Sequence, residues 1–229
     1  MELKPHPDQV VRRLTIGREQ APLLVIDNVV ANADDLLELA AGKILSDDTT
    51  YFPGVRAKAP LSYQRFILEQ FHGLFVEYFG LTGVTLRFTA CHFSLVTTPP
   101  ERLKHLQRIP HVDSAAGNEL AFVHYLFKND LGGTAFYRHR STGFEVVDYS
   151  RKLHYFEEVE RENNGPNKAP PEYINGDTPL YEQVGRQDGV FNRMLVYRRN
   201  SLHSASLRRD FVADANPRTG RISINGFLA

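Results

Sequence analysis

From Val84 onward the pattern of apolar residues changes from a helical to an alternating one, and this change constrains the fold most. VTLRFTACHFSLV alternates, and shorter runs rich in aromatic and β-branched residues follow, separated by glycine and proline; they are LAFVHYLF, GGTAFYRH, GFEVVDY, VFNRMLVYR and GRISINGFL. Successive side chains of a strand point to opposite faces, so such runs are typical of strands with one buried face. Many short strands divided by turn residues predict a sandwich or a barrel.

The N-terminal third predicts one strand and two supporting helices. Residues 22–30 (PLLVIDNVV) are apolar and β-branched, as in a buried strand. Asn32 offers an N-cap to a first helix whose apolar face includes Ile44, and residues 62–79 keep the i, i+3, i+4 spacing of a second, amphipathic helix. We expect residues 49–60, which contain proline and glycine, to form the loop between them. The fold class expected is therefore α+β, mainly β.

A single domain is expected from the length of 229 residues. It divides into a support made of residues 1–83 and a β region made of residues 84–229. Within the β region, residues 150–189 are polar and lack clear periodicity. We interpret this insert either as a lid over a functional site or as a poorly ordered excursion.

The composition excludes several classes of function. Lys and Arg number 27 and Asp and Glu number 27, so there is no global basic field for nucleic acid or an anionic membrane. Cys91 is the only cysteine, which rules out an intramolecular disulfide framework and a cysteine-based zinc finger and favours a reducing compartment. Neither a signal-peptide pattern nor an apolar run of about 18 residues occurs, so we expect a cytoplasmic protein.

Three residues have the types and the spacing of a metal site. In RIPHVDS, His111 and Asp113 are two positions apart, so on a strand both side chains project from one face. His203 follows the strand-like VFNRMLVYR and supplies a second imidazole. Two histidines and one carboxylate leave three positions open on an octahedral Fe(II), the arrangement of non-haem oxygenases. A His-x-Asp pair alone is a weak signal, and Asp113 has an alternative role as the cap of the turn that follows it.

A basic residue near the C-terminus adds a second element to this site. Arg221 begins the alternating run RISIN, and Ser223 lies on the same face of that strand. A guanidinium is the preferred bidentate partner of a carboxylate in a partly dry pocket. We therefore expect the two residues to bind one end of a dicarboxylate.

The order of these motifs resembles the iron(II)- and 2-oxoglutarate-dependent oxygenases, nearest to the prolyl 4-hydroxylase-like branch. It runs from His111-x-Asp113 through LGGTAFY and a strand leading to LHSAS, and ends at Arg221-x-Ser223. The resemblance covers roughly residues 84–228 and implies a double-stranded β-helix, the jelly-roll barrel that cupins also have. The longer gap before Arg221 is expected to be absorbed by FVADANPRTG, which is typical of a hairpin loop.

The same resemblance implies the chemistry of the site. The Fe(II) ligands would be His111, Asp113 and His203. Arg221 would bind the far carboxylate of the cosubstrate 2-oxoglutarate, with Ser223 and Tyr125 as further contacts. The implied reaction hydroxylates an aliphatic C–H bond of a small-molecule or peptide substrate with O2 and releases succinate and CO2. No nucleic-acid or membrane partner is expected.

Two other functions use the same residues. One is a cupin-like metal enzyme that works without 2-oxoglutarate, and the other is a non-catalytic barrel that binds a ligand. The basic residues around the distal histidine also have two interpretations, a solvated rim or a surface that favours an anionic substrate. They are Arg198, Arg199, Arg208 and Arg209.

Overall fold

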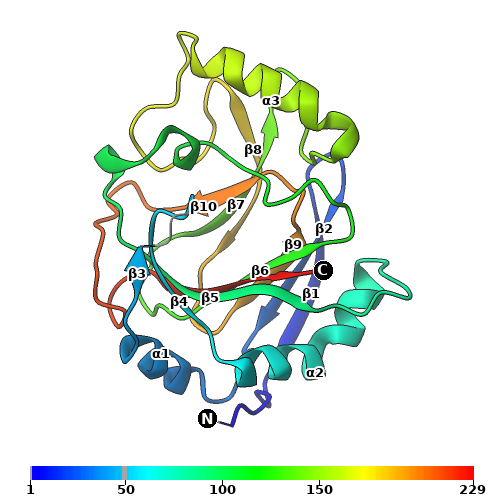
Figure 1. Cartoon of the computed structure of the whole chain (residues 1–229), viewed down its shortest axis with the longest axis vertical. Helices are drawn as coiled ribbons and strands as arrows, with labels where there is room; N and C mark the ends of the chain where they lie inside the picture. Colours follow the sequence, from blue (N-terminus) through cyan, green and yellow to red (C-terminus); the bar gives the residue numbers. More distant parts are fainter. Residues whose placement is uncertain (1, 48–50) are drawn as a thin grey trace.

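The computed structural model describes residues 2–47 and 51–229 and shows two antiparallel sheets (Figure 1). The larger sheet has the strand order β1-β2-β9-β6-β11-β5-β4-β3, and the smaller has the order β10-β7-β8. The strands of the larger sheet are, in that order, Val10–Ile16, Ala21–Asp27, Met194–Arg198, Leu120–Tyr125, Ile222–Leu228, Phe88–Val96, Gly54–Lys58 and Ser46–Asp47. Those of the smaller sheet are His203–Ser206, Gly133–His139 and Tyr181–Asp188. The prediction of a mainly β fold is confirmed.

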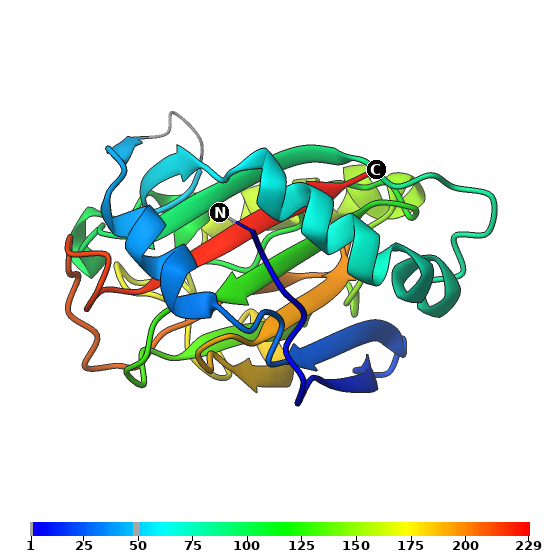
Figure 2. The same ribbon diagram turned by 90° about the horizontal axis from the view of Figure 1, so that it is seen from below.

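Residues 2–47 and 51–229 include three α-helices, which flank the sheets. They are α1 (Ala33–Ala41), α2 (Leu61–Tyr78) and α3 (Tyr149–Asn163), and two short 3-10 turns cover Pro100–Arg102 and His105–Gln107. Figure 2 shows α1 and α2 across one face of the larger sheet, and Figure 1 shows α3 at the opposite end, beyond the smaller sheet. Within the described part of the chain, every helix is too short or too polar to span a bilayer.

The face of the larger sheet that α2 covers is apolar. Tyr63, Phe66, Ile67, Phe71 and Phe75 of α2 are buried, as the helical spacing of the sequence predicts. Each such side chain contributes about 1.5–3 kcal/mol to folding when it is fully buried. We call this face, against which the helices pack, the outer face.

The opposite face of the larger sheet looks toward the smaller sheet. Tyr125 of β6 pairs in register with Ser223 of β11, so both lie on this side. The Tyr125 hydroxyl lies 2.7 Å from Oγ1 of Thr134, which belongs to β7 of the smaller sheet. We call this side, which faces the smaller sheet, the inner face.

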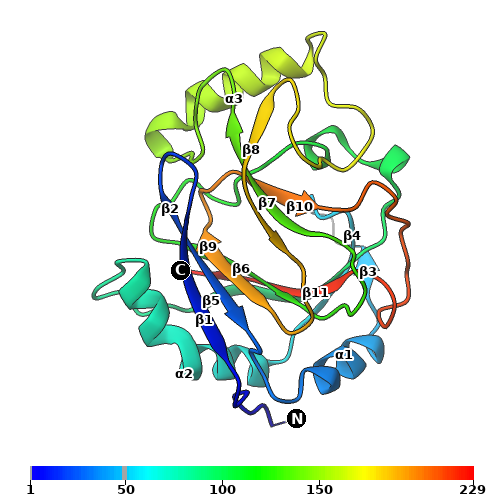
Figure 3. The same ribbon diagram turned by 180° about the vertical axis from the view of Figure 1, so that it is seen from behind.

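The N-terminal segment contributes strands to the larger sheet, which differs in part from the prediction. The predicted strand of residues 22–30 is β2, but β1 was missed because its charged residues mask a strand at the edge of the sheet (Figure 3). Asn32 occupies the N-cap of α1 but accepts no capping hydrogen bond, and its amide donates to Glu2 and to Asp35. The prediction for Ile44 is wrong, because α1 ends before it and its side chain is exposed.

The predicted loop of residues 49–60 is also wrong in part. Residues 49 and 50 lie outside the described residues, but Gly54–Lys58 forms β4, which pairs with β5 and β3. Gly54 opposes Val96, and a Cβ at Gly54 would collide with the backbone of Leu95. Glycine is therefore required there by the close approach of two strands, although in the sequence it looks like a turn residue.

About half of the insert of residues 150–189 forms regular secondary structure. It contains nearly all of α3 and the whole of β8. Asp148 caps α3 by accepting hydrogen bonds from the backbone N–H groups of Ser150 and Arg151. The preceding run GFEVVDY forms no strand and makes only a single bridge, from Val146 to Ser201.

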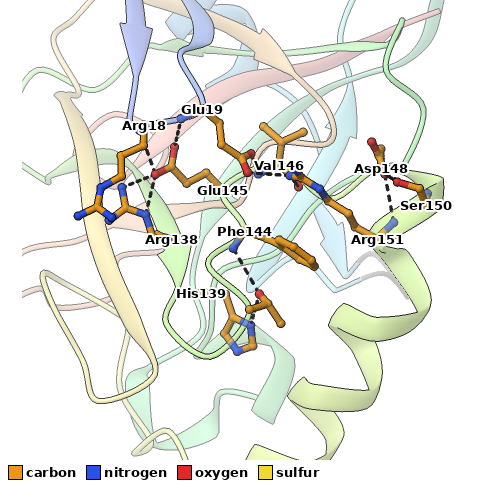
Figure 4. A network of polar contacts seen from close by, with 11 residues as sticks. Arg18, Glu19, Arg138, His139, Phe144, Glu145, Val146, Asp148, Ser150 and Arg151 are labelled. Atoms are coloured by element: carbon orange, nitrogen blue, oxygen red, sulfur yellow. Dashed lines mark hydrogen bonds and ion pairs between the residues drawn. The ribbon is translucent and has the colours of Figure 1, made fainter.

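A polar network ties the β1–β2 turn to the smaller sheet and α3 (Figure 4). The buried Glu145 carboxylate accepts hydrogen bonds from the backbone N–H groups of Arg18 and Glu19 and from the Arg138 guanidinium. Glu19 in turn accepts from Arg151 at the start of α3. Gly17 has a φ of +64°, and a Cβ there would collide with Glu145. The turn is thus shaped around a buried carboxylate.

The connection after His203 differs from the predicted hairpin. His203–Ser206 forms the short strand β10 of the smaller sheet, whereas β11 belongs to the larger sheet. FVADANPRTG is therefore a crossing between sheets and not a hairpin loop. It brings Arg221 to the start of β11.

Candidate metal centre

His111, Asp113 and His203 come together in the structure, and we call them the triad. One potential ligand atom from each residue lies within 4.8 Å of the others. His111 Nε2 is 3.9 Å from Asp113 Oδ1, and His203 Nε2 is 3.6 Å from Asp113 Oδ2. Two imidazoles and one carboxylate at these separations can hold one divalent ion after small rotations of the side chains.

Backbone hydrogen bonds align the two histidines. The N–H of His111 donates to the carbonyl of His203 at 2.9 Å, and the N–H of His203 donates to the carbonyl of His111 at 3.0 Å. Their rings lie side by side, with centroids 4.5 Å apart. This bridge at the edge of β10 brings together residues that are far apart in sequence. The segment RIPHVDS therefore forms a single bridge and not a strand.

The surroundings of the two histidines suit metal binding in different ways. His203 Nδ1 lies 3.0 Å from the carbonyl of Ser201, which leaves Nε2 on the side of Asp113. Partial removal from water and the neighbouring His203 lower the pKa of His111, and Asp113 opposes this shift. A neutral imidazole is the form that binds a metal.

Aromatic side chains enclose the buried side of the triad. The His203 ring has its centroid 4.7 Å from that of Tyr197 on β9, and Phe136 on β7 contacts both rings. Burial, and then the charge of Asp113, raise the pKa of Tyr197 well above its usual value, so its hydroxyl stays neutral. The triad therefore has an apolar wall, which strengthens electrostatic interactions at the site.

Arg221 is a buried cation on the inner face without an acidic partner. Only 4% of the residue is exposed. Its Nη2 donates to the carbonyl of Gly133 at 2.7 Å, and its buried Nε has no hydrogen-bond partner. Its carbon Cζ lies 5.9 and 5.4 Å from the ring centroids of Tyr125 and Phe127. No carboxylate of the described residues forms an ion pair with it.

Ser223 and Tyr125 lie on the inner face near Arg221, but their hydroxyl groups have protein partners. The Ser223 hydroxyl donates to Oδ1 of Asn225 at 2.6 Å. The Tyr125 hydroxyl is shared with Thr134, and burial raises its pKa. The structure thus brings both residues to one end of the site, and their contact with a cosubstrate stays a prediction.

Of the four basic residues near His203, Arg198 and Arg199 are partly buried, whereas Arg208 and Arg209 are exposed. Arg198 donates to the carbonyls of Gly117 and Phe79, and Arg199 donates to Glu119. Arg208 forms ion pairs with aspartates on the surface. Sequence reasoning missed the contacts of Arg198 and Arg199 because each joins segments that lie far apart in the chain.

A cavity of about 410 Å³ opens next to the insert. Its lining includes Ile109, Tyr173, Tyr181, Arg209 and Phe211, but no residue of the triad. Tyr173 donates to the carbonyl of Thr98, so the insert contacts the segment that leads to His111.

Residues 7–228 match a family of unknown function, DUF6445. The chain belongs to the DUF6445 family. No curated protein matches it significantly.

Among solved structures, this DUF6445 protein is similar to SnoN, described as a non-heme alpha ketoglutarate dependent epimerase from nogalamycin biosynthesis. The identity is 15%, the match covers 92% of this chain and 78% of that chain, and the TM-score is 0.53. SnoN with Fe3+, alpha ketoglutarate and nogalamycin RO gives 14% identity over 92% and 79% of the chains and the same TM-score.

HygX from Streptomyces hygroscopicus, solved with nickel and 2-oxoglutarate bound, is a second similar structure. It is 14% identical over 93% of this chain and 87% of that chain, with a TM-score of 0.52. At such identities the likeness concerns the fold. This chain therefore has the fold of enzymes whose structures hold iron or nickel together with 2-oxoglutarate.

Proposed function

We propose that this protein is a non-haem Fe(II)- and 2-oxoglutarate-dependent oxygenase. The observation that carries the proposal is the buried Arg221 guanidinium, which has no carboxylate partner and shares the inner space of the two sheets with the triad. A buried charge without a partner is costly, so its presence is explained best by an anionic ligand.

The triad fits an iron ion by its chemistry. Imidazole and carboxylate ligands suit Fe(II), and three protein ligands leave positions open for a cosubstrate and O2. His203 is oriented by Ser201, a typical arrangement around a metal-binding histidine. We therefore propose that His111, Asp113 and His203 hold the iron.

Arg221 fits the far carboxylate of 2-oxoglutarate. Its Nε is buried and unpartnered, so a carboxylate there would gain a charge-assisted hydrogen bond without displacing a protein acceptor. Tyr125 and Phe127 exclude water from the same guanidinium. Ser223 and Tyr125 remain as proposed further contacts, since a hydroxyl can donate to one group while accepting from another.

The iron and 2-oxoglutarate together would supply the oxidising chemistry: one O2 is consumed, 2-oxoglutarate becomes succinate and CO2, and one oxygen atom enters a C–H bond. The protein would bind both groups, orient them and keep the apolar wall dry. SnoN, described as an epimerase, indicates that the fold serves other outcomes, so hydroxylation is our proposal for this chain.

We further propose the finer features that the motifs predict. The two sheets would form the double-stranded β-helix of this superfamily, within one domain. The prolyl 4-hydroxylase-like branch stays a prediction. The substrate would be a small molecule or peptide, in line with the nogalamycin RO bound by SnoN. The insert would cover that substrate, and the protein would act in the cytoplasm without a nucleic-acid or membrane partner.

The proposal is tested by measuring succinate formed from 2-oxoglutarate by aerobic protein with added Fe(II). We expect slow turnover without a substrate, and none in the Asp113→Ala variant. If the protein binds Fe(II) but forms no succinate and does not bind 2-oxoglutarate, the cupin-like alternative replaces the proposal. If it binds no divalent metal, the non-catalytic barrel does.

A further inference from the structure

Arg199, which follows the last residue of β9, contacts the turn that carries Asp113 with both its backbone and its side chain. Its carbonyl accepts hydrogen bonds from the N–H groups of Asp113 at 2.8 Å and Ser114 at 3.3 Å. Its guanidinium Nη2 donates to the carbonyl of Asp113 at 3.1 Å. One residue therefore holds the backbone of Asp113 at both its donor and its acceptor.

The Arg199 side chain is itself held from two other sides. Nη1 donates to the carboxylate of Glu119 at 2.7 Å, and Cζ lies 4.2 Å from the ring centroid of Phe227 on β11. Only 15% of the side chain is exposed. A planar guanidinium fixed by an ion pair and an aromatic ring is a rigid support, and a lysine cannot reproduce its fork of donors.

The position of the Asp113 carboxylate depends on this support. Asp113 is the only carboxylate of the triad, and it lies between the two histidines at 3.9 and 3.6 Å. No side-chain hydrogen bond to the Asp113 carboxylate occurs among the described residues, so the hydrogen bonds to its backbone are the restraint that keeps this side chain beside the two histidines. A ligand that is fixed before the metal arrives binds it more tightly, because less freedom is lost on binding.

We propose that Arg199 is a positioning residue for the metal site, which holds Asp113 in the ligating arrangement without touching the metal. This inference rests on the proposed function in so far as the triad binds a divalent metal. It assigns a role to a residue that the sequence shows only as one of several arginines.

Arg198 provides a matched control from the same strand end. Its guanidinium donates to the carbonyls of Gly117 and Phe79 and lies over the Phe79 ring, so it also joins distant segments. Neither partner is a residue of the triad, and Gly117 lies four residues beyond Asp113, whereas Arg199 bonds to Asp113 itself. A role limited to folding would therefore make replacements of Arg198 and Arg199 similar in their effects.

The experiment measures Co(II) affinity from the visible absorption of the bound ion in the full-length protein. We expect Arg199→Met and Arg199→Lys to raise the Kd for Co(II) about 10–100-fold, the usual effect of losing an outer support of a ligand. Arg198→Met should leave the Kd within about 3-fold of the unmodified protein, the scatter expected of context effects. In metal-free protein, the backbone amides of Asp113 and Ser114 should exchange hydrogen faster in both Arg199 variants than in the unmodified protein. In Arg198→Met their exchange should be unchanged.

Equal Kd values for the Arg199 variants and the unmodified protein would overturn the inference, as would an equal increase in Arg198→Met. Unchanged exchange at Asp113 and Ser114 would overturn it even if a variant is too unstable for the titration. If the unmodified protein binds no Co(II), the proposed function itself fails. If it binds Co(II) and the variants bind equally well, only the inference about Arg199 fails.

Discussion

The two faces of the larger sheet treat buried polar side chains differently. On the outer face His124 is fully buried, but its Nδ1 lies 3.0 Å from the Tyr63 hydroxyl and its Nε2 lies 3.2 Å from Oδ1 of Asn192. On the inner face Arg221 is almost as deeply buried, yet its Nε has no partner. Both residues are polar groups in a β protein core, and only one is satisfied by the protein.

We interpret this difference as that between a structural polar residue and one that would bind a ligand. A buried polar group left unpaired costs about 1–3 kcal/mol, and more when it is charged. His124 avoids that cost by bonding both ring nitrogens. Arg221 avoids only part of it through Gly133. Under our proposal, the inner face would be built for binding an anionic ligand, at a cost to the stability of the free protein.

The largest effect is expected for the triad. Replacing Asp113 with Ala removes the only carboxylate of the site, so we expect Fe(II) or Co(II) affinity to fall more than 100-fold, beyond the 10–100-fold effect of an outer support. Succinate formation should disappear with it. Isothermal titration with Co(II) measures the affinity. His154→Ala, which removes an exposed histidine of α3, is the control and should bind Co(II) normally. Full metal affinity in Asp113→Ala contradicts the assignment.

A smaller effect is expected at the other end of the site. Arg221→Met removes a charge-assisted contact worth about 1.5–3 kcal/mol, so we expect 2-oxoglutarate to bind about 10–150-fold more weakly. The Kd for the metal should not change. Because an unpaired buried cation is lost, the free protein should be at least as stable in urea unfolding. A large loss of stability with unchanged 2-oxoglutarate binding would make Arg221 a structural residue.

The smallest effect concerns the outer face and pH. Burial lowers the pKa of His124 from its ordinary value near 6.5 to about 4, while Asn192 opposes this shift. Between these values the unfolded chain binds more protons at this site than the folded protein. The contribution of neutral His124 to the free energy of unfolding is therefore complete above pH 6.5 and is lost as the pH falls toward 4. The loss is about 2–3 kcal/mol at pH 4.5.

Urea unfolding at pH 7.5 and pH 4.5 measures this loss. In the His124→Gln variant, whose amide has no comparable titration, the fall in the free energy of unfolding between the two pH values should be smaller by that amount. An equal fall in the two proteins would mean that His124 is charged in the folded state and that the outer face is not as closed as its contacts indicate.

Short-range patterns predicted the parts of the site that depend on local spacing. His111 and Asp113 were found because they are two positions apart, and Arg221 because it begins an alternating strand. The distal His203 needed the order of the family motifs. Helix α2 was predicted nearly to its ends because its buried residues recur at helical spacing along 18 residues.

The missed features depend on contacts between distant segments. Strand β10 has only four residues, too few for a periodic signal, and it exists because it pairs with β7. Helix α3 buries only Tyr155 and Val159, so its pattern in the sequence is weak. Arg199 looked like one of a basic cluster, and only its contacts with Asp113 and Glu119 distinguish it.

The most direct test of the central claim is an anaerobic titration of the protein with Fe(II) and 2-oxoglutarate, followed by visible absorption. The account predicts a weak charge-transfer band that appears only when both are present, because 2-oxoglutarate would chelate the iron held by His111, Asp113 and His203. The band should need much more 2-oxoglutarate in Arg221→Met. Iron binding without any such band at saturating 2-oxoglutarate would contradict the account.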